Sequence, residues 1–582
     1  MLLVMILLAV SLIVLGATLR RTSTTSSLND RNNLYITSGS AAEAATEKAV
    51  ALMMNDFQVD GESRISARIA RYQTNVPTST ENPFWANFEF SDAKGNVGQT
   101  YVYRTDTNAN MAFVDLQDQF AGLKGFSSNY RVISNVRPLN SPYTFTNAVQ
   151  QDIQLSEIPI FQFAIFYNGL MEYTFCAPLT VRGRVHANGD IYVGSSSDLS
   201  FNYTVSTTGT ITSPAWDGHT PAQYTGKVTY SGTPTPGYST GVPSMVLPIG
   251  ASNTPTALHE IINPPPPGED PNSPISFQRY YNKAGMLILV SNSTVNVVLK
   301  NHGNDPFPAT VAWSNVMYFV SITNSFWDER EQMSNRVTQI DVGKFITWAA
   351  TNQNVGLKFG MSTGDKLNIL YVGDFRTPTA SVFNAVRLVN GATAPSVGFT
   401  VATANPLYIW GVYNCPNSSY LNTTNTTASA PCSVVCDALT ILSSAWDDSK
   451  KIDGSGGHNS AVVNTVNTAI IAGSVYSTGA GATTYSGGVM NLPRLLENWS
   501  GIKFTLNTSM ISLYNSRMVT HQFVNPGVYY KAPTRDFNFD QNFTSPDKLP
   551  PGTPAIRRLV RGSWCNPKPN STNYNFAAFN GQ

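Results

Sequence analysis

The sequence has little charge for its size. Only 13% of its 582 residues are Asp, Glu, Lys or Arg, about half the usual share in soluble globular proteins. The net charge is +1, which gives no electrostatic reason for binding nucleic acid or an anionic membrane surface. Asn, Ser, Thr and Gly take the place of the charged residues, and this composition indicates an exported protein.

No basic residue precedes the apolar segment at the N-terminus. Residues 1–19 carry no charge; the run is too long for the core of a secretory signal peptide and lacks its positively charged start. As a helix it would span roughly 28 Å, enough to cross a bilayer. Arg20 and Arg21 follow it, and the positive-inside rule would then keep the body in the cytoplasm. We expect instead that a basic leader has been removed and that Met1 is a mature N-terminus.

The five cysteines fit a common zinc site poorly. Cys415, Cys432 and Cys436 follow a C-x16-C-x3-C pattern without a nearby His, and Cys176 and Cys565 are far away. The spacing favours a disulfide between Cys415 and Cys432, with Cys436 or Cys565 pairing elsewhere and one thiol left over or bonded between subunits. Buried free cysteines are the alternative.

Motifs of the common enzyme classes are missing as well. The sequence has no G-x-S-x-G elbow, Walker loop, H-E-x-x-H or G-x-G-x-x-G. Asp447 and Asp448 could seat Ca²⁺ or form an acid/base pair with Asp453, but an acidic, Gly-rich surface loop explains them equally well. The histidines are scattered singly, at 186, 219, 259, 302, 458 and 521. We therefore expect no catalytic residues, no metal and no cofactor.

The N-terminal region predicts one long helix. Residues 22–27, TSTTSS, and the preceding Gly16 are poor helix formers. From residue 28 apolar residues recur every three or four positions, as on an amphipathic helix. The turn DGES at 60–63 marks its end. We predict a helix of about 55 residues, with Gly16 as the place where it breaks or loosens.

Beyond residue 60 the pattern predicts short strands separated by Gly, Pro and Asn. Residues 181–213 form a succession of short strands with an Asn-Gly turn; they fit either a hairpin meander or a few rungs of a β-helix, since no period is regular. Residues 457–472 fit a strand pair or a short helix, and 492–499 one or two helical turns. The predicted strands elsewhere are 100–105, 287–300, 309–323 and 366–375.

These patterns predict an α+β fold that is mainly β, with a long N-terminal helix and a large β-rich region built as a β-helix or a sandwich. Proline-rich stretches at 233–243 and 263–274 are candidate linkers. The expected divisions are an N-terminal helix at 1–57, a first β-rich region packed on it at 58–175, a central β-rich region at 176–405 and a C-terminal one with the Cys cluster at 406–582.

Nine N-x-S/T sequons are candidate glycosylation sites, although an Asn/Thr-rich chain produces such triplets by chance. They are Asn202, Asn292, Asn417, Asn422, Asn425, Asn498, Asn507, Asn542 and Asn570.

The N-terminal pattern resembles the type IV pilins. The uncharged apolar start and the stretch AAEAATEKAVALM at 41–53 are similar to the PilX-like group of large envelope proteins. Segments such as VRGRVHANGDIYVG, PLYIWGVYN and YSGGVMNLPRLLENWSG resemble the same group. The resemblance implies a prepilin whose basic leader is cut by a dedicated membrane peptidase, and whose helix lies in the inner membrane before assembly.

One residue departs from the pilin pattern. Pilins that polymerise typically carry Glu at position 5, where it pairs with the N-terminal amine of a neighbouring subunit, whereas this chain has Met5. An assembly without that carboxylate must satisfy or neutralise the amine in another way, because a buried unpaired charge is costly.

The resemblance implies a structural subunit of an extracellular type IV pilus-like filament, which packs through its apolar helix against itself or other pilins. The implied partners are the prepilin peptidase, the assembly machinery and the inner membrane. One alternative is a minor or tip subunit that primes assembly or binds glycans; another is a membrane-anchored β-helical envelope hydrolase. The expected assembly core is Met1, Leu2, Leu3, Met5, Ile6, Leu8, Ile13 and Leu15.

Overall fold

The chain folds into two compact units in a computed structural model. The first unit comprises Met1–Val114, Gly125–Ile158 and Ile556–Gln582, and the second comprises Asp115–Lys124 and Pro159–Ala555. The expected boundaries after residues 175 and 405 therefore both fall inside the second unit. The described residues are 1–92, 94, 96–107, 111–116, 123–143, 145–213, 220–245, 249, 252, 254–301, 305–359, 367–450, 459–475, 477, 479, 481, 484, 486, 488–523 and 526–567.

The first unit begins with a single helix, α1 (Leu2–Asp60). It ends at Gly61, whose φ of 75° lies in the left-handed region, and the amide of Gly61 donates to the carbonyl of Phe57. The predicted length and the predicted end near residue 60 are both right.

The helix passes through Gly16 without a break in this structure, and a loosening there on assembly stays a prediction. A single glycine in a helix costs only about 1 kcal/mol. In and beside the Ser/Thr-rich stretch, hydroxyls bond back to carbonyls four residues earlier, as Ser and Thr in helix interiors do. Thr18 Oγ1 donates to the carbonyl of Val14 at 3.0 Å, and Thr22 Oγ1 donates to that of Thr18 at 2.9 Å.

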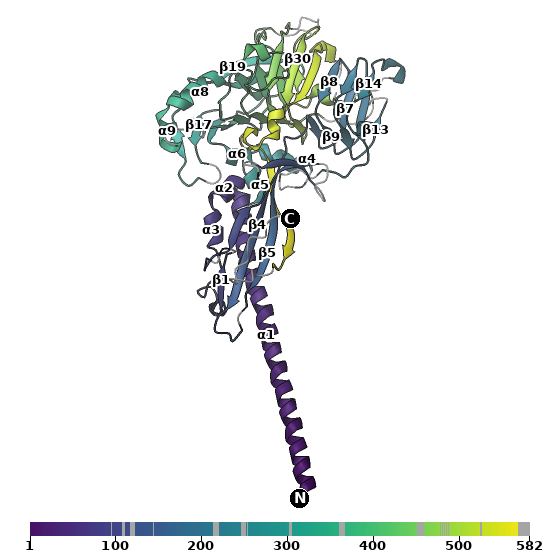
Figure 1. Ribbon diagram of the computed structural model, residues 1–582. Helices are drawn as coiled ribbons and strands as arrows, with labels where there is room; N and C mark the ends of the chain where they lie inside the picture. The colour runs from purple at the N-terminus through teal and green to yellow at the C-terminus, as the bar shows by residue number, and fades with distance from the viewer. Residues whose placement is uncertain are drawn as a thin grey trace. The chain divides into compact units, whose positions relative to one another are not determined.

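The second half of α1 packs on a mainly antiparallel sheet, with strand order β1-β4-β5-β33 and with β2 and β3 also paired to β4. Ala41, Ala42, Ala45 and Ala49 are fully buried; these small side chains let the helix approach the sheet closely. Figure 1 shows the first half of α1 continuing beyond this sheet. The strands are β1 (Phe88–Ser91), β2 (Tyr101–Arg104), β3 (Ala112–Asp115), β4 (Lys124–Pro138), β5 (Asn147–Pro159) and β33 (Ala555–Cys565), and the short helices are α2 (Glu62–Ala67), α3 (Ile69–Gln73) and η1 (Pro83–Asn87).

The second unit is a parallel β-helix. Its first coils are equal in length: Val185 pairs in parallel with Ile165 on one side and with Val205 on the other. The next coil is longer, because Val205 pairs with Tyr238. These strands are β6 (Ile165–Tyr167), β7 (Met171–Cys176), β8 (Leu179–Arg182), β9 (Val185–Ala187), β10 (Ile191–Ser195), β11 (Leu199–Phe201), β12 (Val205–Thr207), β13 (Ile211–Thr212), β14 (Val228–Tyr230) and β15 (Tyr238–Ser239).

A second series of coils follows later in the chain. Ile369 pairs with Thr400, and Phe399 with Cys432, so these successive coils are longer than the first ones and nearly equal to each other. The strands are β21 (Ile369–Asp374), β22 (Val382–Val389), β23 (Phe399–Ala402), β24 (Leu407–Trp410), β25 (Cys432–Cys436), β26 (Leu439–Leu442), β27 (Asn464–Asn467), β28 (Ala469–Ala472), β29 (Arg494–Leu495), β30 (Lys503–Thr508), β31 (Met510–Ser512) and β32 (Thr534–Phe539).

The two series join in the middle of the β-helix. β31 pairs in parallel with β6, and β32 with β8, so the last coil in the chain stacks on the first. The chain therefore enters the β-helix at its centre, winds to one end, crosses to the other end and winds back. Entry and exit are adjacent: the amide of Ile160 donates to the carbonyl of Pro554 at 3.0 Å.

Antiparallel strands and short helices complete the unit. β16 pairs with β17, β17 with β18, and β19 with β20, all antiparallel. The remaining elements are β16 (Met286–Val290), β17 (Val295–Leu299), β18 (Ala309–Val311), β19 (Val320–Asp328), β20 (Met333–Asp341), α4 (Pro255–His259), α5 (Pro274–Gln278), α6 (Tyr280–Lys283), α7 (Trp313–Val316), α8 (Val342–Thr351), α9 (Gln353–Phe359), η3 (Pro221–Gln223), η4 (Glu260–Ile262), η6 (Ser418–Tyr420), η7 (Gly488–Asn491), η8 (Pro526–Val528), η9 (Gln541–Thr544) and η10 (Pro546–Lys548).

The predicted fold class, a long helix followed by a mainly β region, is confirmed. Of the two readings of residues 181–213, the β-helix is right and the hairpin meander is wrong, because the strands there pair in parallel. The described part of residues 457–472 contains β27 and β28, so the prediction of a strand pair is right and that of a short helix is wrong. The helical turns predicted at 492–499 are wrong, since Arg494–Leu495 form β29 against β26.

Candidate functional site

The first half of α1 is the most unusual surface of the chain. Every large apolar side chain from Met1 to Leu15 is at least 53% exposed. Burying one such side chain is worth about 1.5–3 kcal/mol, so a rod of this kind is unstable in water. The helix is long and apolar enough to cross a membrane, with a mean hydropathy of 2.9 in its most apolar window. By length and composition it is a surface for a membrane or for other apolar helices.

The eight residues expected to form the assembly core all lie on this exposed rod and on all sides of it. They are Met1, Leu2, Leu3, Met5, Ile6, Leu8, Ile13 and Leu15. None is buried against the first unit, which begins to contact α1 only further along. Tyr143, in the loop between β4 and β5, donates its hydroxyl to the carbonyl of Ser27 at 2.8 Å.

A shallow hollow of about 350 Å³ lies at this first point of contact. It is lined by Thr24, Ser27, Leu28, Arg31, Pro142 and Tyr143. Nearby, the rings of Tyr35 and Phe145 lie 5.8 Å apart. The loop between β4 and β5 thus marks where the free half of α1 ends and the packed half begins.

The cysteines do not form the predicted disulfide. All five, Cys176, Cys415, Cys432, Cys436 and Cys565, are free thiols. Cys432 and Cys436 point from β25 into the apolar interior of the β-helix, and burial raises the pKa of both thiols. Cys415 lies in the loop after β24, and its sulfur donates to the carbonyl of Asn417. Four of the five thiols are buried, as that alternative expects, and Cys565 is half-buried.

The nine sequons differ in exposure. Asn202 and Asn292 are exposed, Asn507 is buried, and Asn570 lies outside the described residues. The amide of Asn292 exchanges hydrogen bonds with Thr377. The remaining five are half-buried: Asn417, Asn422, Asn425, Asn498 and Asn542. Asn507 is therefore closed to a glycosylating enzyme in the folded chain, whereas Asn202 is open to one.

Asn507 instead belongs to a ladder of stacked asparagines inside the β-helix. Asn467, Asn507 and Asn538 occupy matching positions on β27, β30 and β32. Asn507 Nδ2 donates to Asn467 Oδ1 at 2.8 Å, and Asn538 Nδ2 donates to Asn507 Oδ1 at 3.1 Å. The ladder leaves no regular pattern in the sequence, because the three residues are separated by coils of unequal length.

We predict that Asn507→Ala lowers the free energy of unfolding by about 2–3 kcal/mol, since it leaves buried amide groups of the ladder without partners. Scanning calorimetry of the full chain in detergent measures the fall in Tm. Asn202→Ala is the matched control, because it removes an exposed amide of another sequon. Equal melting of the two variants would contradict a structural role for the ladder.

The acidic pair noted in the sequence is engaged in structural contacts. Both carboxylate oxygens of Asp448 accept bonds from the Arg387 guanidinium, at 2.7 and 2.9 Å. Asp447 accepts from the backbone and hydroxyl of Ser449. Asp453 lies outside the described residues. In the part of the chain that the structure describes, no group of three or more His, Cys, Asp or Glu side chains could hold a metal ion.

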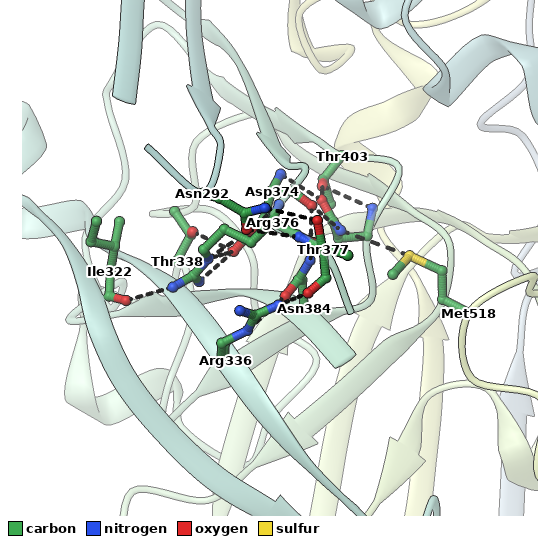
Figure 2. Close-up of polar contacts among 11 residues, drawn as sticks. Asn292, Ile322, Arg336, Thr338, Asp374, Arg376, Thr377, Asn384, Thr403 and Met518 are labelled. Carbon is green, nitrogen blue, oxygen red and sulfur yellow. Dashed lines mark hydrogen bonds and ion pairs between the residues drawn. The ribbon is translucent and has the colours of Figure 1, made fainter. Parts of the chain in front are cut away.

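A buried polar network at the end of β21 has the same structural character (Figure 2). Asp374 is paired with the guanidinium of Arg376, at 2.5–3.2 Å, and accepts the hydroxyl of Thr338 at 2.8 Å. Arg376 also donates to the carbonyl of Ile322, and the amide of Asn384 reaches the Arg376 carbonyl. These contacts tie neighbouring coils to the turn after β21.

A second buried network lies at the turn between β19 and β20. Glu331 pairs with Arg494 of β29, and both side chains are buried. Asp328 accepts the hydroxyl of Tyr408 at 2.6 Å and the amide of Glu331 at 3.0 Å. Burial raises the pKa of Asp328, while Arg494 keeps the pKa of Glu331 below its ordinary value despite burial. The positive charges of Arg494 and of Arg330, which belongs to the turn itself, thus both favour the ionised form of Glu331.

Three of the six histidines are described, and two of them are buried. His259 lies 3.2 Å from the carboxylate of Asp437, which also accepts from Ser516 and Arg517. Burial lowers the pKa of His186 to about 4, so this ring is neutral at physiological pH. His521 is exposed; positions 219, 302 and 458 lie outside the described residues. His186 and His259 are packed into the β-helix and not displayed on a surface.

Glu497 is a buried carboxyl group without a cationic partner among the contacts that shift its pKa. It accepts the amide and the hydroxyl of Ser443, both at 2.6 Å. Burial raises its pKa from an ordinary 4.5 to about 7. The folded chain therefore holds a proton there that the unfolded chain releases at a lower pH.

We predict that this group makes the second unit less stable as the pH rises. Its contribution to stability is full below the unfolded pKa and is lost as the pH rises through about 7, a change of about 3 kcal/mol. Glu497→Gln, whose amide can keep both bonds to Ser443, is expected to melt higher than the wild-type chain at pH 8 and similarly at pH 5. Parallel pH profiles of Tm for the two chains would contradict this assignment.

No family model matches the chain, and the search of curated proteins gave no match. Among solved structures, the chain is similar to the competence-associated pilin ComZ from Thermus thermophilus. The identity is 10%, the match covers 91% of this chain and 97% of that chain, and the TM-score is 0.25. At this identity and TM-score the likeness establishes neither a shared fold nor a shared function, so the chain's own geometry must support any proposal.

Proposed function

We propose that this chain is a non-enzymatic structural subunit of a type IV pilus-like surface filament, related to the PilX-like pilins. One observation carries the proposal: a single helix has its second half packed on its own sheet, while its first third is apolar and exposed on all sides. Such a rod needs a membrane before assembly and other copies of itself afterwards, because either environment keeps its side chains out of water.

The second unit supports a non-catalytic role. Of the carboxylates that stood out in the sequence, Asp448 is engaged by Arg387, and Asp447 accepts the amide and the hydroxyl of Ser449. The envelope hydrolase is therefore the weaker proposal, since these groups would have to break structural contacts to act on a substrate. The β-helix instead offers a rigid, weakly charged body suited to a filament exterior.

In this proposal the helix resides in the inner membrane until the assembly machinery extracts it, after a prepilin peptidase has cut a leader. Gly16 and the stretch at 22–27 are where the helix would loosen in a stretched filament, because they are its weakest helix formers. Glycans at exposed sequons, Asn202 first, would decorate the outside.

Two observations favour a minor or tip subunit as the second candidate. Met5 stands where polymerising pilins carry an acid, and the body is large for a subunit repeated along a filament. An adhesive role at the tip would place function in the β-helix and not in α1.

Shearing the surface of cells that make this protein, followed by cryo-electron microscopy and mass spectrometry of the released material, tests the proposal. Continuous filaments with α1 at the centre are expected for a main subunit. Presence only at filament ends would support the second candidate. Absence from all sheared filaments, with the protein left in the membrane fraction, would overturn both.

A further inference from the structure

The exposed half of α1 carries very few charges. Before Glu43, the charged side chains are Arg20, Arg21, Asp30 and Arg31. All four are exposed. Within the part of the chain that the structure describes, none of them takes part in an ion pair. Charges left unpaired on a helix that enters an apolar bundle are costly, so they need partners outside the chain.

Arg31 differs from the other three in its surroundings. It lies eleven residues before the buried Ala42, within about 20° of the same side of the helix, and it lines the hollow beneath Tyr143. It therefore faces the side on which the first unit's own sheet packs. Arg21 and Asp30 do not line that hollow.

Arg21 and Asp30 point to opposite sides of the helix. They are nine residues apart, and nine steps of about 100° add up to two and a half turns. Along the axis they are separated by about 13.5 Å. When two parallel helices pack side by side, opposite sides of the two copies face each other. If one copy is shifted by this separation, Arg21 of one copy comes level with Asp30 of the next.

We propose that neighbouring copies of this chain are held in register by an ion pair between Arg21 of one copy and Asp30 of the next. The inference rests on the proposed filament function and names the contact that sets the shift between subunits. Asp30 is the only acidic side chain in the first 42 residues, so a parallel neighbour offers Arg21 no other carboxylate along the exposed half of α1. The ion pair would set the register between neighbouring subunits, as a carboxylate at position 5 does in other pilins, where this chain has Met5.

Anionic lipid headgroups are the competing partner for Arg21. They would attract Arg20 and Arg21 at the membrane surface, but they would repel Asp30. The ion pair between copies satisfies both residues at once, and Arg20, on the next position of the helix, adds positive charge beside Arg21.

Charge reversal tests the contact in the cells that make the protein, with sheared filaments and membrane-held subunits measured separately. Arg21→Asp and Asp30→Arg are each expected to lower filament yield at least tenfold while the membrane pool is kept. The double variant Arg21→Asp/Asp30→Arg is expected to recover most of the yield. Arg31→Asp is the control, because that side chain faces its own unit, and it should retain far more yield than Arg21→Asp.

Cysteine pairs test the geometry directly. Mild oxidation of filaments of the Arg21→Cys/Asp30→Cys variant should give a ladder of cross-linked chains. The Arg21→Cys/Arg31→Cys variant, whose second cysteine lies one position further along the helix, should give little cross-linking. Normal wild-type filaments with unaffected single reversals and no ladder would overturn the register contact and leave the filament function standing. If the wild-type chain never enters filaments, the proposed filament function, on which the contact rests, is itself contradicted.

Discussion

Replacing Leu8 with aspartate is expected to abolish filaments. Leu8 lies in the middle of the exposed apolar run of α1, and in a bundle its side chain would be surrounded by apolar neighbours. An unpaired carboxylate there costs several kcal/mol in each subunit, and the cost recurs at every subunit added. The yield of sheared filaments should therefore fall below detection.

Two controls separate the bundle from the membrane. Aspartate at the centre of a membrane helix costs about 2.5–3.5 kcal/mol on insertion scales, so the membrane fraction must be measured as well. Ser26→Asp adds the same charge in the polar stretch and should leave filaments intact, and Leu8→Met should have little effect. Normal filaments from Leu8→Asp would mean that residues 1–15 do not form a packed core.

Replacing Arg494 with methionine is expected to give the largest loss of stability in the second unit. The substitution removes the ion-pair partner of the buried Glu331 carboxylate, which then has only the charge of Arg330 to offset burial and the nearby carboxyl group of Asp328. Breaking a buried ion pair in this way costs about 3–5 kcal/mol. Thermal melting of the full chain in detergent, followed by limited proteolysis of the β-helix, measures the effect.

The partner substitution makes the test specific. Adding Glu331→Gln to Arg494→Met removes the stranded charge and should recover part of the lost stability. Lys344→Met is the surface control, because Lys344 is 53% exposed and lies 3.9 Å from Asp341; exposed pairs are worth about 0–1 kcal/mol. A loss no larger than that of Lys344→Met would show that the network carries little of the stability.

The long helix could be predicted from the sequence because its signals are local. An uncharged apolar run, a three-to-four-residue periodicity up to Met53 and a glycine at position 61 each indicate helix or its end without reference to distant residues. Gly16 lies inside the continuous helix of this structure, although its residue type disfavours helix. Local propensity is weak, since a single glycine costs a long helix only about 1 kcal/mol.

The β-helix was harder to predict, because its repeat is interrupted. Ile165, Val185 and Val205 are evenly spaced in the chain and stack in one sheet, but the following coil adds a long insertion and the later coils are longer throughout. The order of the coils is also hidden, since the strands that stack in the middle come from both ends of the unit. The asparagine ladder and the Arg494 network depend on that stacking, so no local pattern could reveal them.

The hydrogen bond between Ile160 and Pro554 has an evolutionary consequence. The β-helix is an insertion between two strands of the sheet in the first unit, and the two ends of this insertion meet at Ile160 and Pro554. Any domain whose termini lie close together could be inserted at the same position. Both outer ends of the β-helix lie within this insertion, so coils can be gained or lost there without disturbing the strands that return to that sheet. Natural selection can therefore remodel the body by whole coils while the N-terminal helix stays unchanged.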